Sequence, residues 1–335
     1  MSDGVTRRRL VAGAAGAAAA LGLQAVPGLG AGTAAAAIRR SRRFDLTAGS
    51  RALIKEKALK GGRVLQSFAF DNANRHIYTV QLMSGSAIPS GDLCVTELDL
   101  AGRRLGHMYL RGFGHGEQIG IESAGAGAVP YLWTEYRARD GWGTRLARFR
   151  FADGASIDSS HPGISDRTPR LLGLASPRPA IDPWHNRLVV RFTRDGRLRA
   201  AVYDLDDARK GLLDGRHRLA EVSLPDPSRS TQPAQGFALF GQYVYLFHGT
   251  AYGRDGSKAP TGNAHITCVD MNTGRVVERR LTTAFRGLTF REPEGMAIQV
   301  TSPGDHAPEV RLCFGFASGA TGARRASIAY KNLLI

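Results

Sequence analysis

Short runs of alternating apolar and polar residues cover most of the chain after position 43. They are rich in Val, Phe, Tyr and Leu, and segments rich in Gly, Pro, Asn and Asp separate them. A period of two is typical of β-strands, whereas only Asp206 to Leu213 fits a helix, and a short one. The pattern therefore predicts an all-β fold.

A longer period becomes visible when the apolar runs are aligned with one another. Five runs carry a small residue between two apolar ones, and each is followed by two further strand-like runs. The small residues are Ala69, Gly120, Ala180, Ala238 and Ala297. Strands that converge on a common axis have little room at their midpoints, so this column predicts a β-propeller of five blades.

The number of blades and the closure of the ring depend on two further segments. The run from Phe44 to Lys57 precedes the first complete unit, and we expect it to supply the outer strand that the last blade lacks. A hairpin around Arg216 to Val222 lengthens the third unit, so that six or seven blades are also compatible with the sequence.

The N-terminus has the pattern of an export signal. Arg7, Arg8 and Arg9 precede a weakly apolar run rich in Ala and Gly, and small residues at positions 34–37 suit a signal peptidase. We therefore expect a cleaved twin-arginine signal peptide at 1–37 and a single propeller domain at 38–335. The mature protein is expected to be secreted, with no stable membrane insertion after cleavage.

The charge of the chain suggests an anionic partner. Lys and Arg number 45 against 29 Asp and Glu, a formal net charge of +16. An exported basic protein meets cell-wall polymers and acidic polysaccharides, and export argues against nucleic acid. A coding bias toward arginine would give the same excess, so charge alone does not decide the partner.

Neither a cofactor nor a metal is expected from the motifs. Cys94, Cys268 and Cys313 are an odd number, have no CxxC spacing and lie within apolar runs. We predict that they are buried thiols.

Polar residues stand where the first strand of a unit begins and where its second strand ends. Antiparallel pairing brings these two positions to the same face of a propeller, at one mouth of the axial channel. The predicted ligand-binding residues are Gln66, Gln81, His115, Glu117, Gln118, Glu135, Arg178, Arg191, Gln235, His248 and Glu294. The alternative is that they only line a water-filled channel.

His115 lies in the most distinctive of these segments, Gly112 to Gln118. The glycines on both sides of it allow tight turns and leave the imidazole accessible. Such a histidine can bind a ligand or act as a general base.

The residues from 98 to 122, LDLAGRRLGHMYLRGFGHGEQIGIE, together with YLWTE and GTRLARFRF, resemble a known family. The chain is similar to actinobacterial secreted proteins labelled teichoic acid biosynthesis protein C, whose domain resembles the propeller of certain phage receptor-binding proteins. The resemblance runs from about Phe44 to the end. It implies a propeller that recognises wall teichoic acid or another cell-envelope glycopolymer.

A looser resemblance links the GHG segment, a strand Tyr and a strand Arg to propeller polysaccharide lyases. It implies an alternative function, in which a uronic-acid-containing glycan is cleaved by His115, Tyr136 and Arg191. Binding without catalysis and lyase activity are both open at the level of the sequence.

Overall fold

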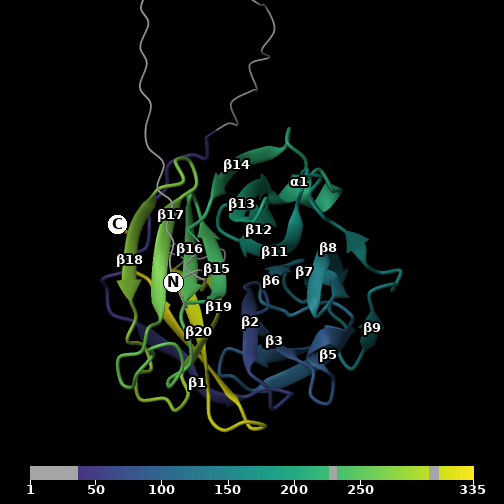
Figure 1. Ribbon diagram of the computed structural model, residues 1–335. Helices are drawn as coiled ribbons and strands as arrows, with labels where there is room; N and C mark the ends of the chain where they lie inside the picture. Colours follow the sequence, from purple (N-terminus) through teal and green to yellow (C-terminus); the bar gives the residue numbers. More distant parts are fainter. Residues whose placement is uncertain (1–36, 226–231, 302–308) are drawn as a thin grey trace, which may run out of the picture. The chain divides into compact units, whose positions relative to one another are not determined.

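Five separate β-sheets make up the part of the chain that the computed structural model describes, residues 37–225, 232–301 and 309–335 (Figure 1). The expected signal peptide lies, apart from its last residue, outside the described residues. The expected short helix is present as α1 (Leu205–Lys210), which Asp204 caps by accepting from the N–H groups of Asp206 and Asp207.

Each sheet is one blade, and in the first four blades the strands run in sequence order from the inside outward. The first blade consists of β2 (Leu65–Asp71), β3 (His76–Leu82), β4 (Leu93–Asp99), β5 (Arg104–Arg111) and β9 (Ser156–Asp158). The second consists of β6 (Ile119–Glu122), β7 (Tyr131–Arg139), β8 (Trp142–Arg150) and β10 (Ser165–Asp166). The third consists of β11 (Ala175–Asp182), β12 (Arg187–Arg194), β13 (Arg197–Asp204) and β14 (Arg218–Ser223).

The last two blades complete the ring. The fourth contains β15 (Ala234–Phe240), β16 (Tyr243–His248), β17 (His265–Asp270) and β18 (Val276–Leu281). The fifth contains β19 (Glu292–Val300), β20 (Val310–Ser318), β21 (Arg325–Lys331) and, outermost, β1 (Arg51–Ala58). Strand β1 therefore closes the last blade with the N-terminal end of the domain, which confirms the expectation for that segment. The only 3-10 helix of the described residues, η1 (Ile88–Ser90), lies between β3 and β4.

The fold is a five-bladed propeller, as the column of small residues predicted. Ala69, Gly120, Ala180, Ala238 and Ala297 lie on the inner strands of five different sheets. These inner strands, β2, β6, β11, β15 and β19, contact one another in a closed ring. The segment Arg216 to Val222 is the outer strand β14 of the third blade, so the alternatives with six or seven blades are wrong.

A β-bulge interrupts the start of the inner strand in four of the five blades. The pairing register shifts between Leu65 and Ser67, between Ala175 and Arg178, between Ala234 and Gly236, and between Glu294 and Met296. A bulge adds a residue to one strand and redirects the side chains beside it. Here the bulges change the direction of side chains at one end of the axial channel.

Apolar side chains fill the space between the blades. Phe68, Phe113 and Phe149 belong to one such core cluster, and Tyr245 and Phe314 to another. The three cysteines are buried and unpaired, which confirms that prediction. None of the described helices has the length and apolar character needed to cross a membrane.

Candidate functional site at the mouth of the propeller

Two cavities open at the end of the propeller where the inner strands begin. The larger has a volume of about 810 Å³ and the smaller of about 370 Å³. They share four lining residues, Gln66, His115, Gln235 and Glu294, so they form one divided depression. We call this depression the mouth.

One column of the repeat supplies the shared wall of the mouth. The residue three positions before the small axial residue is polar in four blades, and all four side chains line the smaller cavity: Gln66, Glu117, Gln235 and Glu294. In the third blade this position is Pro177, and Arg178 follows it. The repeat thus brings polar groups from different blades to one place.

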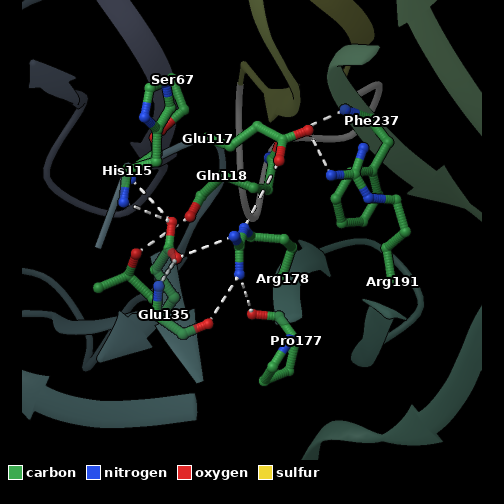
Figure 2. A network of polar contacts seen from close by, with 12 residues as sticks. Ser67, His115, Glu117, Gln118, Glu135, Pro177, Arg178, Arg191 and Phe237 are labelled. Carbon is green, nitrogen blue, oxygen red and sulfur yellow. Dashed lines mark hydrogen bonds and ion pairs between the residues drawn. The ribbon is translucent and has the colours of Figure 1, made fainter. Parts of the chain in front are cut away.

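Two arginines of the third blade neutralise Glu117, as Figure 2 shows. Arg191 forms an ion pair with Oε1 of Glu117, and Nε of Arg178 lies 3.5 Å from its Oε2. Burial raises the pKa of Glu117, but the two guanidinium groups outweigh burial and hold it below its usual value. Glu117 is therefore a carboxylate at neutral pH, fixed by two blades.

Behind this pair, Glu135 is saturated by donors from the protein itself (Figure 2). Its carboxylate accepts from the N–H groups of His115 at 3.1 Å, Gly116 at 2.8 Å and Gly143, and Nη2 of Arg178 lies 3.0 Å away. A Cβ on Gly114 would lie 2.3 Å from Oε2 of Glu135. Gly114 and Gly143 are needed because the backbone closes around the carboxylate of Glu135 at these two positions.

The imidazole of His115 stacks on the ring of Trp142. The ring centroids are 4.4 Å apart and the ring planes differ by 18°. Burial lowers the pKa of His115 and the charge of Arg178 lowers it further, while Glu117 opposes both. The imidazole is therefore neutral at pH 7 and can both donate and accept a hydrogen bond toward a ligand in the mouth.

Trp142→Ala is expected to raise the pKa of His115 toward its ordinary value, because the substitution exposes the imidazole to water and burial is the main cause of the shift. The measurement is an NMR titration of the histidine ring nitrogens. Trp184→Ala is the matched control, since Trp184 is 45% exposed and Trp142 44%. An unchanged titration of His115 in Trp142→Ala would show that other contacts desolvate the ring.

The structure brings six of the eleven predicted ligand-binding residues into the mouth and places the other five behind it. Gln81 is buried and holds the loop at Gly61 to Arg63 through its amide. Gln118 joins three blades, because it donates to the carbonyl of Met296 and accepts from the N–H of Phe237. The remaining three buried members of the set are Glu135, Arg178 and His248.

The three residues of the lyase hypothesis do not lie together. His115 and Arg191 line the smaller cavity, but Tyr136 lines neither cavity. The ring of Tyr136 packs against Phe113, and burial together with a hydrogen bond to Asp166 raises its pKa to about 12. A phenol placed in this way is poorly suited to abstract a proton from a glycan in the mouth.

The sequence pattern did not predict several residues of the larger cavity, because they lie on loops between strands. Arg63, Arg254 and Arg324 line it, and none of them forms an ion pair with a described residue. Arg324 lies over the ring of Phe290, with its guanidinium carbon 3.4 Å from the ring centroid. The larger cavity thus has a cationic rim.

Below this rim, two glutamates from the start of β19 face the mouth. Burial raises the pKa of Glu292, and Arg254 and Arg324 only partly offset it. Burial and the nearby charges of Glu292 and Glu117 raise the pKa of Glu294 well above its usual value. Among the residues that the structure describes, Glu294 has no hydrogen-bond or ion-pair partner for its carboxyl group, and it is only 5% exposed.

No group of three or more His, Cys, Asp or Glu side chains in the described part of the chain is arranged to hold an ion. The side chains that line the mouth offer guanidinium, carboxyl, amide and aromatic groups to a ligand.

Comparisons with known proteins agree with this architecture. The chain is 28% identical over 312 residues to "Putative major teichoic acid biosynthesis protein C" of Bacillus subtilis (strain 168), which covers 89% of the chain and 66% of that protein. The solved structure of the tail fiber of Staphylococcus aureus phage P68 matches with a TM-score of 0.69 at 20% identity, over 86% of this chain and 54% of the fiber. The chain therefore spans less than two thirds of either protein.

A family model describes the same region. The model of the phage five-bladed β-propeller receptor-binding platform domain matches residues 64–330, which extend from the start of the first blade to the end of the fifth. The chain belongs to this family of phage-type receptor-binding propellers.

Proposed function

We propose that the propeller binds an anionic cell-envelope glycopolymer of the teichoic acid type through its mouth. The observation that carries the proposal is the larger cavity of about 810 Å³, which is lined by Arg63, Arg254 and Arg324, and none of these arginines forms an ion pair with a described residue. Guanidinium groups bind phosphate and carboxylate oxygens in a fixed geometry, so they suit a repeating anion.

The smaller cavity adds groups that suit the sugar or polyol part of such a polymer. It is lined by Trp142 and His115, with the amides of Gln66 and Gln235 beside them. Aromatic faces pack on sugar rings, and amides exchange hydrogen bonds with hydroxyl groups. One repeat unit can thus place its anion at the cationic rim and its hydroxyls in the neighbouring cavity.

The names of the relatives support the same ligand class. One relative is named for teichoic acid biosynthesis, the other is a phage tail fiber, and the family model describes a receptor-binding platform. Secretion through the predicted twin-arginine signal belongs to this proposal, because such polymers lie outside the cytoplasmic membrane. The signal itself falls on residues outside the described part of the chain.

The test is retention of the purified protein on Gram-positive cell walls before and after hydrofluoric acid treatment, which removes phosphodiester-linked polymers. We expect retention on untreated walls, weaker retention at higher salt, and none on treated walls. Equal retention on both preparations would contradict the proposal.

Arg254→Ala is expected to weaken wall binding by about 1 kcal/mol, or roughly fivefold, because Arg254 is an exposed guanidinium at the rim with no ion-pair partner. The measurement is the dissociation constant for solubilised wall polymer at low and moderate salt. Arg275→Ala is the control, since Arg275 is equally an exposed arginine but lies at the turn between β17 and β18. A loss of the same size in both variants would point to unspecific charge attraction.

A further inference from the structure

Glu294 is an unusual residue of the mouth. Binding of the hydroxyl and phosphate groups of a ligand does not explain why a buried carboxyl group lies there. Its side chain is only 5% exposed, yet it lines both cavities. No described donor lies within hydrogen-bond distance of its carboxyl group, and its electrostatic neighbours are the acidic Glu292 and Glu117. Buried carboxyl groups normally have such partners, because burial without them costs free energy.

The other buried glutamates show what a satisfied carboxyl looks like in this fold. Glu122 is also 5% exposed, and it is bound by Arg148, Arg209 and Trp133. Glu135 accepts from three backbone N–H groups and Arg178. The fold therefore provides donors for these buried carboxyls, and for Glu294 it provides an open cavity instead.

The position of Glu294 is suited to a cation carried by the ligand. The side chain lies on the wall that the two cavities share, between the cationic rim and the cavity with Trp142. A ligand whose anion binds at Arg254 or Arg324 can reach Glu294 with a group on the same repeat unit. An ammonium group would supply both the positive charge and the three donors that the carboxyl lacks.

We propose that Glu294 is the recognition residue for a primary ammonium group carried next to the anion, so that the mouth prefers zwitterionic repeat units to purely anionic ones. This inference rests on the proposed function, because it assigns a specificity to the same mouth. The ammonium can come from an amino sugar or from an amino acid esterified to the polymer, and both present the same chemistry to Glu294.

The first test uses two small probes that differ only in the amine. Phosphoethanolamine carries an ammonium group two carbons from its phosphate, and N-acetyl phosphoethanolamine carries an amide there. We expect the wild-type protein to bind phosphoethanolamine at least tenfold more tightly, as measured by NMR titration. Equal affinities, or no binding of either probe at tens of millimolar, would overturn the inference.

The variant Glu294→Gln tests whether Glu294 binds an ammonium group or a hydroxyl group of the ligand. Glutamine still exchanges hydrogen bonds with a hydroxyl but provides no negative charge. We expect the variant to lose the preference between the probes, with the affinity for N-acetyl phosphoethanolamine unchanged within a factor of two. Glu122→Gln, the control at a buried glutamate outside the mouth, should keep the preference. A preference that survives in Glu294→Gln would overturn the inference.

The polymer experiment distinguishes the two sources and keeps this inference separate from the proposed function. Acetylation of cell walls caps all primary amines, and mild base removes only ester-linked amino acids. We expect acetylation to weaken retention of the wild-type protein, and mild base to do the same only if esters carry the amine. Unchanged retention after acetylation overturns the ammonium inference alone, whereas absent retention on untreated walls overturns the proposed function.

Discussion

Arg178→Ala should lower the free energy of unfolding by about 3–5 kcal/mol, the usual cost of removing one partner from a buried ion pair. Arg178 is 1% exposed and serves two carboxylates, with Nη2 3.0 Å from Glu135 and Nε 3.5 Å from Glu117. Its Nη1 also donates to the carbonyls of Gly143 and Pro177. Without it, Glu135 keeps its backbone donors but loses the guanidinium group that neutralises it deep between two blades.

Equilibrium unfolding in guanidinium chloride, followed by tryptophan fluorescence, measures the loss. Arg178→Lys should recover only part of it, because one ammonium cannot replace a planar fork that reaches two carboxylates and two carbonyls. Arg275→Ala, at an exposed turn, should change the free energy of unfolding by less than about 0.5 kcal/mol. A loss below about 1 kcal/mol for Arg178→Ala would mean that water reaches Glu135 in solution.

The architecture could be predicted because steric crowding requires a small residue at the same position of every repeat. Ala69, Ala180 and Ala297 stand where inner strands crowd around the axis, and no surface requirement competes with that need. The closing strand β1 was predictable for a related reason, since the last unit was one strand short. It was harder to predict which outer strand belongs to which blade. The third-blade segment that suggested an additional hairpin is the ordinary outer strand β14.

The outer edge of the first blade depends on a strand pairing that no local sequence pattern predicts. Strand β9 follows the second blade's β8 in the sequence, yet it pairs in parallel with β5 of the first blade. Its three residues are too few to show a strand period. Contacts of this kind depend on how loops pack over the finished ring and not on alternation within the segment.

The mouth was predictable where strands supply it and not where loops do. Strand polarity placed Gln66, Glu117, Gln235 and Glu294 at one end of the channel, and they line one cavity. Strand direction does not show which polar groups are already hydrogen-bonded within the protein. Glu135 was therefore predicted to bind a ligand, although donors within the protein occupy its carboxylate oxygens.

For residues on loops, no comparable sequence pattern predicts a position at the mouth. Arg254 and Arg324 reach the rim from segments far apart in the chain, and nothing near either of them marks a site. The bulges that displace Gln66 and Gln235 are equally invisible in an alternating pattern, because one extra residue merely looks like a change of strand start.

Glu122→Gln and Glu294→Gln should change the stability at pH 7 in opposite directions, although both glutamates are 5% exposed. Arg148, Arg209 and Trp133 bind Glu122, and Nη2 of Arg148 is 2.7 Å from its Oε1. Its removal leaves Arg148 without its carboxylate, so we expect a loss of about 3 kcal/mol. Glu294 has no such donor, so Glu294→Gln removes only the cost of burying a charge, and we expect a gain of roughly 1 kcal/mol.

The pH dependence of the two variants tests the cause of these changes. Burial opposes ionisation of Glu122, but its donors outweigh burial and lower its pKa below 4.5; its contribution to stability is therefore present above pH 4.5 and is lost as the pH falls through the folded-state pKa. Burial and two acidic neighbours raise the pKa of Glu294 above 4.5, so the wild type loses stability as the pH rises above that value. Thermal unfolding between pH 3 and 8 should thus show the loss in Glu122→Gln growing up to about pH 4.5 and staying constant above it, and the gain in Glu294→Gln growing as the pH rises above 4.5. A destabilising Glu294→Gln at pH 7 would mean that the carboxyl has a stabilising partner within the protein, and would leave no vacancy at the mouth for an ammonium group.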